Sequence, residues 1–171
     1  LYSSAASDVY KRQVDIKQID EAMAISTEAG GFRVGAAVSG ARLKEHDTLS
    51  ASWPGVVEAA DLIGSTQIQG RASMGGNLCN ASPAADTVPA LIAAGATCAL
   101  AGPGGRREVP VEEICTGPGQ TILTDGEFVV SILLPARGSR SGDAYLRFIP
   151  RTEMDIAVVG VGVSLSLDRD G

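Results

Sequence analysis

The residues best suited to chemistry lie in one run, IGSTQIQGRASMGGNLCNASPAAD, between Ile63 and Asp86. Its glycines stand among serine and asparagine side chains, at Gly64, Gly70, Gly75 and Gly76. Paired glycines let the backbone approach a ligand closely, and successive N–H groups in such a turn can bind an anion. The Ser73 hydroxyl and the Asn77 carboxamide could reach phosphate or ribose oxygens. The run therefore favours a site for a phosphate-bearing ligand.

The same glycines are also compatible with a plain ordered loop, which is the commoner reason for such a composition. Neither G-x-G-x-x-G nor G-x-x-x-x-G-K-[ST] occurs, so the run is not the fingerprint of a Rossmann fold or a P-loop. We predict that residues 64–83 form an ordered loop, neither a helix nor a strand pair. Gly75 or Gly76 should have a positive φ or a backbone approach that a Cβ would block.

Regular elements must position this run, and the apolar pattern predicts several. We expect strands over 32–38, 97–101, 107–111 and 128–134, and helices over 39–46, 54–63 and 87–94. Pro54 suits an early helical position, and Ser52 and Asp86 stand where they could cap the last two helices. The continuous apolar run of 128–134 indicates a strand buried on both faces.

The C-terminal part is expected to begin a second unit. Residues 136–143 are rich in Arg, Gly and Ser and read as a linker, with strands following over 145–148 and 157–167. In the latter, large apolar side chains alternate with small ones such as Gly160 and Gly162, a period of two that is typical of a strand. The small face should lie close to another backbone or where a missing helix would pack.

Composition excludes several functions. The 171 residues carry a net charge of −6 with scattered basic residues, which argues against a nucleic-acid partner. No apolar run has the roughly 18 to 20 residues of a membrane span. The three cysteines form no C-x-x-C pair, which argues against an iron–sulfur cluster or zinc site within the chain. An odd number of cysteines fits a reducing compartment, so we expect a cytoplasmic protein.

Residues 1–13, LYSSAASDVYKRQ, differ from the rest. Asp8–Gln13 resembles the translation of a transposase adapter end used for sequencing libraries, so we expect a leader that is not biological and makes few contacts with the core. An ordinary polar leader is the alternative. With the adapter interpretation, the natural N-terminus would lie upstream of Val14.

A family resemblance rests on Ala72–Asp86, ASMGGNLCNASPAAD. This run resembles the second flavin-binding loop of the FAD subunits of molybdenum hydroxylases, the xanthine dehydrogenase and aerobic carbon monoxide dehydrogenase type, which is close to G-T-I-G-G-N followed by N-A-S-P-A-A-D. The segments IGSTQI, AGPGGRREVPVEE and AYLRFIPRTEMDIAVVGVGVSLSL are similar to family segments in the same order, so the resemblance covers 14–171. Gln69, Gly70 and Ala72 depart from the family pattern. The family's first flavin loop has no counterpart here.

The resemblance implies an α+β fold: a vanillyl-alcohol-oxidase-type FAD-binding domain over 14–138, truncated at its N-terminus, then the first strands of a C-terminal α+β domain over 142–171. The flavin-contacting positions that it implies are Ser73, Met74, Gly75, Gly76, Asn77, Asp86, Val129 and Arg147, with Ile63 as an apolar wall. In these roles, Ser73 and the glycine amides suit the pyrophosphate, Asp86 suits a donor group of the cofactor, and Arg147 would place positive charge near the isoalloxazine.

Each of these residues also has a structural explanation. Asp86 could cap a helix, Arg147 could pair with Glu153 or Asp155, and Met74 and Val129 could be plain core. The flavin interpretation is preferred because the motif and its flanking segments agree.

The implied function is electron transfer from iron–sulfur clusters through FAD to NAD, a quinone or another acceptor. The expected partners are a molybdenum-cofactor subunit and an iron–sulfur subunit. No side chain of this chain is expected to act as a catalytic acid or base or to bind a metal. The alternatives are a flavin-free scaffold and a stand-alone flavin reductase of the same fold. Because the first flavin loop is missing, this chain alone is expected to bind FAD weakly.

Overall fold

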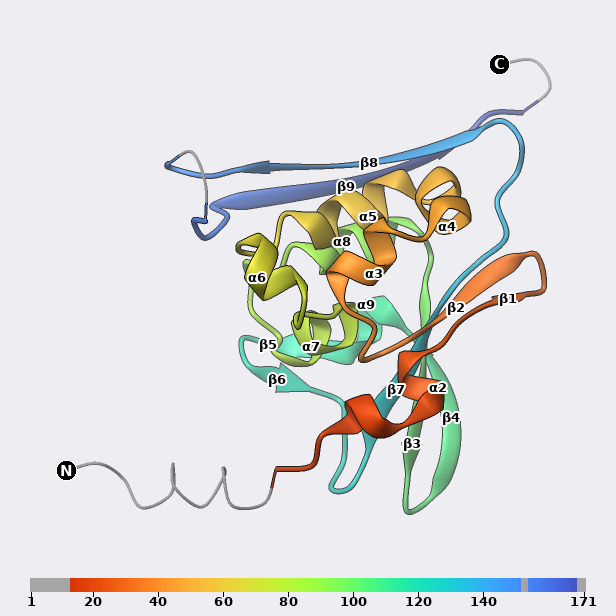
Figure 1. Cartoon of the computed structure of the whole chain (residues 1–171), viewed down its shortest axis with the longest axis vertical. Helices are drawn as coiled ribbons and strands as arrows, with labels where there is room; N and C mark the ends of the chain where they lie inside the picture. The colour runs from red at the N-terminus through yellow and green to blue at the C-terminus, as the bar shows by residue number, and fades with distance from the viewer. Residues whose placement is uncertain (1–12, 152–153, 169–171) are drawn as a thin grey trace.

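A five-stranded antiparallel sheet forms one layer of the protein (Figure 1). The computed structural model describes residues 13–151 and 154–168. In sheet order the strands are β1 (Ile25–Glu28), β2 (Gly31–Gly35), β7 (Phe128–Leu134), β3 (Thr97–Gly102) and β4 (Gly105–Pro110). The predicted strand over 128–134 is confirmed, and it lies at the centre of the sheet with most of its side chains buried. Central position explains why its sequence is apolar on both faces.

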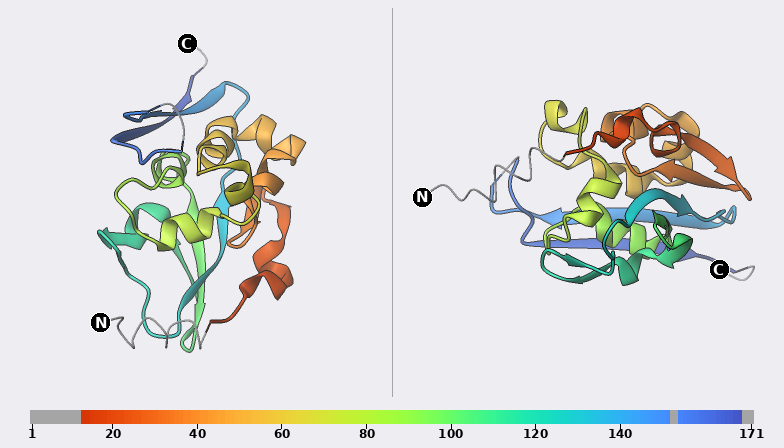
Figure 2. Two further views of the ribbon diagram at one scale, coloured as in Figure 1. Left: turned by 60° about the vertical axis from the view of Figure 1, so that its left-hand side comes forward. Right: turned by 90° about the horizontal axis from the view of Figure 1, so that it is seen from below.

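Helices form the middle layer, and a long hairpin covers them on the side away from the sheet (Figures 1 and 2). The helical elements are η1 (Ile16–Gln18), α2 (Asp20–Met23), α3 (Gly40–Lys44), α4 (Asp47–Ser52), α5 (Pro54–Asp61), α6 (Thr66–Gln69), α7 (Met74–Cys79), α8 (Thr87–Ala93) and α9 (Val111–Ile114). A small sheet pairs β5 (Cys115–Gly117) with β6 (Gln120–Thr121). The hairpin consists of β8 (Ser141–Phe148) and β9 (Val159–Ser166).

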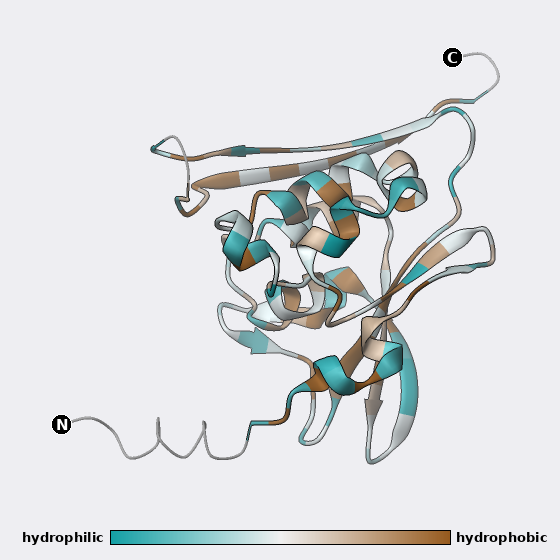
Figure 3. Ribbon diagram, in the orientation of Figure 1, coloured by the Kyte–Doolittle hydropathy of each residue, from teal (hydrophilic) through white to brown (hydrophobic). Residues whose placement is uncertain are grey.

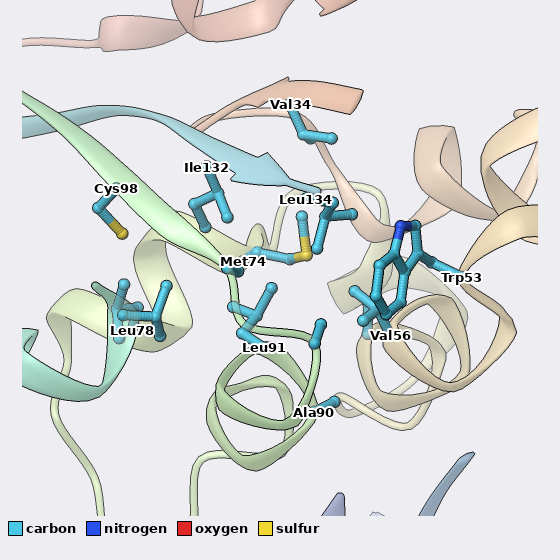
Figure 4. Close-up of a cluster of buried hydrophobic side chains, with 14 of the residues drawn as sticks. Val34, Trp53, Val56, Met74, Leu78, Ala90, Leu91, Cys98, Ile132 and Leu134 are labelled. Carbon is cyan, nitrogen blue, oxygen red and sulfur yellow. The ribbon is translucent and has the colours of Figure 1, made fainter. Parts of the chain in front are cut away.

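The core lies between the sheet and the helices (Figure 4). Met74 and Leu91 from two helices meet Ile132 and Leu134 of β7, and all four side chains are buried. Trp53 closes the cluster beside Val56. Burial of each large apolar side chain contributes about 1.5 to 3 kcal/mol. This cluster therefore holds the glycine-rich segment, through Met74, against the central strand.

Most predicted elements are confirmed with shifted ends, but the bounds of one strand and the cap of one helix differ from the prediction. The strand predicted over 32–38 ends at Gly35, where Val38 donates its N–H to the Gly35 carbonyl and turns the chain toward α3. Ser52 does not cap α5, because it is the last residue of α4 and Trp53 occupies the capping position. The N–H of Val56 is instead bound by the Asp143 carboxylate, at 3.1 Å.

The two strands predicted over 145–148 and 157–167 are confirmed, and they pair as a hairpin. Among the described strands, β8 and β9 pair only with each other and do not extend the sheet that contains β7. β8 begins at Ser141, inside the segment expected to be a linker. A Cβ at Gly162 would stand 2.4 Å from the Pro89 carbonyl oxygen, so the small face of β9 does approach a backbone, that of α8. That 142–171 begins a separate domain stays a prediction.

The expected leader falls almost entirely outside the described residues, since the description starts at Gln13. Within the described ranges, none of the helices combines the length and the apolar character needed to cross a bilayer.

Candidate functional site

The glycine-rich run is not a loop throughout, and this corrects our prediction for residues 64–83. It contains two short helices, α6 and α7, and α7 passes through the Met-Gly-Gly-Asn motif. Ser73 is the reason: its Oγ accepts a hydrogen bond from the Gly76 N–H at 3.1 Å, which is the contact of a helix N-cap. Each glycine inside a helix destabilises it by up to about 1 kcal/mol relative to alanine. Burial of Met74 and Leu78 on the core side offsets that cost.

Gly75 is required by close packing. A Cβ at this position would lie 2.5 Å from the carbonyl oxygen of Ala36, a distance that real structures do not tolerate. Neither Gly75 nor Gly76 has a positive φ, whereas Gly64 does, at 62°. The predicted close approach is therefore confirmed at Gly75, and it brings the start of α7 against the end of β2.

A cavity of about 620 Å³ opens beside this helix start, and we call it the first hollow. Four of the predicted site residues line it, namely Ser73, Gly75, Gly76 and Val129. They come from α7 and from the beginning of the central strand β7. The structure thus brings together residues more than fifty positions apart that the sequence analysis had grouped only by resemblance.

Two cationic side chains that the sequence analysis did not single out also line the first hollow, Lys17 and Arg71. The Lys17 ammonium donates to the carbonyl oxygens of Ala37 at 3.0 Å and Arg71 at 3.2 Å, which ties the N-terminal segment to the wall. The acidic Glu127 at the same wall is held by Arg107, at 2.8 Å, and this partner keeps the pKa of Glu127 low, at about 2. The other acidic residue of the lining, Asp15, accepts a hydrogen bond from the Lys17 N–H at 3.0 Å. Positive charge is therefore offered to a ligand locally, by Lys17 and Arg71.

The start of α7 adds backbone donors to this charge. The first N–H groups of a helix lack partners within the helix. In α7 the Gly76 N–H is bound by the Ser73 side chain. Such groups suit phosphate oxygens. Lys17 and Arg71 stand in the same wall, so the residues present fit a diphosphate.

Two other predicted residues of the run point elsewhere. Met74 lies in the core, 3% exposed. Asn77 accepts two hydrogen bonds at its Oδ1, from the Thr87 N–H at 3.0 Å and the Thr87 hydroxyl at 2.6 Å. Asn77 therefore caps α8 and joins it to α7. Cys79 is exposed and lies at the first hollow.

A second hollow of about 620 Å³ lies at the other end of the glycine-rich run. Gly64, Ser65 and Gln69 line it from the run, and Tyr145 and Arg147 line it from β8. The predicted residue Ile63 is half-buried and does not line this hollow, although its neighbours Leu62 and Gly64 do.

Asp86 and Arg147 form an ion pair beside the second hollow. Nη1 of Arg147 lies 3.1 Å from both carboxylate oxygens, and the Tyr145 hydroxyl donates to Oδ1 at 3.0 Å. Asp86 makes no capping bond to α8, which corrects the expected cap; Asn77 binds the Thr87 N–H instead. Of the two alternative partners of Arg147, Asp155 is bound by Arg151 at 2.9 Å, and Glu153 lies outside the described residues.

One continuous segment lines both hollows. Gln69 faces the second and Arg71 the first, two residues apart in sequence. The side chain of Gln69 is fixed by a hydrogen bond from its amide to the Asp61 carbonyl. The arrangement suits a long ligand that carries its negative charge at the first hollow.

Fold and site together define a binding domain for an extended, phosphate-bearing cofactor. The sequence model of the family described as the FAD binding domain in molybdopterin dehydrogenase matches residues 3–137. The chain belongs to this family, and the cofactor of the domain is FAD. The resemblance inferred from the motifs is confirmed.

Named relatives agree with the family. The chain is 31% identical over 165 residues to a putative xanthine dehydrogenase FAD-binding subunit of Escherichia coli, covering 95% of the chain and 56% of that relative. It is 33% identical over 150 residues to the carbon monoxide dehydrogenase medium chain of Hydrogenophaga pseudoflava, covering 88% and 52%. The chain thus spans about half the length of the curated relatives that it matches.

Solved structures give the same fold. Carbon monoxide dehydrogenase from Hydrogenophaga pseudoflava superposes with a TM-score of 0.85 at 32% identity, over 90% of this chain and 53% of that one. Reconstituted CO dehydrogenase from Oligotropha carboxidovorans gives 0.86 at 29% identity, over 91% and 54%. The predicted α+β FAD-binding fold is confirmed.

Proposed function

We propose that the full-length protein containing this domain transfers electrons through FAD within a molybdenum-containing hydroxylase. It takes electrons from the iron–sulfur clusters of one partner subunit and passes them to NAD, a quinone or another acceptor. A further subunit holds the molybdenum cofactor and the organic substrate. Relatives named as FAD-binding subunits and as medium chains support this assignment.

The observation that carries the proposal is the shared wall of the two hollows. The Ser73-capped start of α7, with Arg71 and Lys17, offers donors and positive charge at the first hollow. Arg147 stands at the second. We assign the diphosphate to the first hollow and the isoalloxazine to the second, with the cofactor lying along residues 64–76.

Bound FAD would supply the redox chemistry, accepting electrons and passing them on. The side chains here hold and orient it. Val129 offers an apolar surface to the part of the cofactor beyond the diphosphate, because it is a buried residue of β7 that reaches the first hollow. Arg147 adds positive charge beside the ring, which favours the reduced anionic form.

The test is production of the full-length protein with the subunits encoded beside it, followed by measurement of bound FAD and of its reduction by substrate. We expect stoichiometric FAD that substrate reduces only when the iron–sulfur and molybdenum subunits are present. A complex without flavin would indicate a scaffold. Flavin reduction by NADH or NADPH followed by turnover of a substrate by the isolated subunit would indicate a stand-alone reductase.

A charge variant tests the first hollow. Arg71→Gln should weaken FAD binding about tenfold or more, since a charge-assisted hydrogen bond contributes about 1.5 to 3 kcal/mol and 1.4 kcal/mol is tenfold. Arg106→Gln is the matched control, because Arg106 is an exposed arginine of β4 that pairs with Glu21 outside both hollows. Equal FAD affinity of the two variants would contradict the assignment.

A further inference from the structure

Tyr145 lines the second hollow, and its hydroxyl has no role in the motif or in the cofactor assignment. Tyr145 is 1% exposed, yet it lies on a strand whose neighbouring side chains Ala144 and Leu146 are exposed. A buried phenol needs a hydrogen-bond partner. It finds one in Asp86, across 3.0 Å and 59 residues of sequence.

Asp86 is shared between two donors from the same strand. Tyr145 binds Oδ1, and Arg147 contacts both carboxylate oxygens at 3.1 Å. Residues 145 and 147 point to the same face of β8 because side chains alternate along a strand. The carboxylate therefore fixes two side chains of β8 with one group from the start of α8.

Burial makes this network rigid. The side chains of Arg147 and Asp86 are 10% and 11% exposed. Burial and the Asp86 carboxylate both raise the pKa of Tyr145, so its hydroxyl remains a donor. In such surroundings a missing partner leaves the remaining polar groups poorly satisfied.

The facing strand is shaped to admit the tyrosine. Gly160 pairs with Arg147 and Gly162 pairs with Tyr145 across the hairpin. A Cβ at Gly160 would lie 2.3 Å from the Tyr145 hydroxyl oxygen. The absence of a side chain at Gly160 is thus what allows the hydroxyl to reach Asp86.

We propose that Tyr145 is a positioning residue: with Asp86 it holds the guanidinium of Arg147 at the rim of the second hollow, where that group tunes the bound flavin. Asp86 is contacted by one nitrogen of the guanidinium, Nη1, and the Arg147 side chain lines the second hollow. The proposal rests on the proposed function, because it takes the second hollow as the place of the flavin ring.

The experiment measures the reduction potential of FAD in the full-length protein and its variants. Arg147→Gln should weaken binding of reduced relative to oxidised flavin about tenfold, which is about 30 mV toward more negative potential in a two-electron couple. Tyr145→Phe should shift the potential in the same direction while FAD remains bound. We expect it to lower the affinity for reduced flavin relative to oxidised flavin about threefold. Arg106→Gln should leave the potential unchanged.

A second variant covers the case in which Tyr145→Phe fails to fold. Gly160→Ala crowds the hydroxyl without altering any member of the network and should also lower the potential. The proposal is overturned if Tyr145→Phe changes the thermal stability but leaves the reduction potential at the wild-type value. It is also overturned if Arg147→Gln leaves the reduction potential unchanged. Absence of FAD from the wild type would instead refute the proposed function, so the two failures are distinguishable.

Discussion

The side chain of Asn77 binds both the backbone N–H and the hydroxyl of Thr87, at 3.0 and 2.6 Å. Thr87 is fully buried, so no solvent can replace these bonds. Asn77→Ala should therefore destabilise the protein by about 2 to 6 kcal/mol, since each of the two unsatisfied buried groups costs about 1 to 3 kcal/mol. Urea unfolding measures this change. Asn77→Asp keeps an acceptor near the start of α8 and should cost much less; an equal loss for both variants would show that the cap is unimportant.

The two glycines of α7 should respond differently to alanine. Gly75→Ala places a methyl group 2.5 Å from the Ala36 carbonyl oxygen and 2.7 Å from its Cβ. Overpacking of this kind costs about 1 to 3 kcal/mol. At Gly76 the closest contact is the Ser73 Oγ at 3.2 Å, and alanine favours a helix by up to about 1 kcal/mol. The unfolding temperature of Gly75→Ala should be well below that of Gly76→Ala. The reverse order would contradict the close approach at Gly75.

Asp143 connects the hairpin to α5. Its carboxylate binds the Val56 N–H at 3.1 Å and Arg137 at 2.6 Å, with the Arg137 guanidinium 4.5 Å from the centre of the Trp53 ring. The side chains of both charged partners are largely buried. Asp143→Ala leaves Arg137 as a buried unpaired charge, which should cost about 3 to 5 kcal/mol in urea unfolding.

Asp143→Asn serves as the comparison for Asp143→Ala. The asparagine keeps an oxygen that can accept from the Val56 N–H but lacks the negative charge. The stability of this variant in urea unfolding should therefore lie between those of the wild type and the alanine variant. A loss below 1 kcal/mol for Asp143→Ala would show that the ion pair does not hold the hairpin.

Acid stability should depend on Glu127. The Arg107 side chain, with the Thr124 N–H, lowers the pKa of Glu127 to about 2 in the folded protein. A depressed folded pKa contributes stability above the ordinary pKa of about 4.3 for glutamate, and that contribution is lost as the pH falls toward 2. Glu127→Gln should therefore be less stable than the wild type near neutral pH, with the difference vanishing at low pH. Unfolding midpoints across this range check the prediction, and a constant difference would contradict it.

How far the sequence predicts the structure depends on whether local or long-range contacts decide each element. β7 and α8 were predictable, because a continuous apolar run and an apolar periodicity leave few alternatives. α7 was not, since its Gly-Gly pair disfavours a helix. The Ser73 cap and the burial of Met74 and Leu78 compensate.

The site residues also divide into those that a local motif identifies and those that only long-range contacts bring to the site. Ser73, Gly75 and Gly76 were found from the motif. Lys17 reaches the first hollow by bonds spanning 20 and 54 residues, and Tyr145 meets Asp86 across 59. No pattern along the chain encodes contacts of that range. Asp86 was assigned to a cap that Asn77 supplies, because both have side chains suited to that position.

The alternation of β9 also has a consequence for handling the polypeptide. Gly162 faces α8, so the large side chains of β9 face outward. In Figure 3 the hydrophobic residues of β9 appear as brown bands along the strand. They are substantially exposed at Val159, Val161, Val163 and Leu165, as are Leu146 and Phe148 on β8. Apolar surfaces of this extent promote association. Residues 1–171 produced alone should therefore form concentration-dependent oligomers in sedimentation experiments, and charged substitutions at Val161 and Val163 should make the polypeptide more soluble without unfolding it.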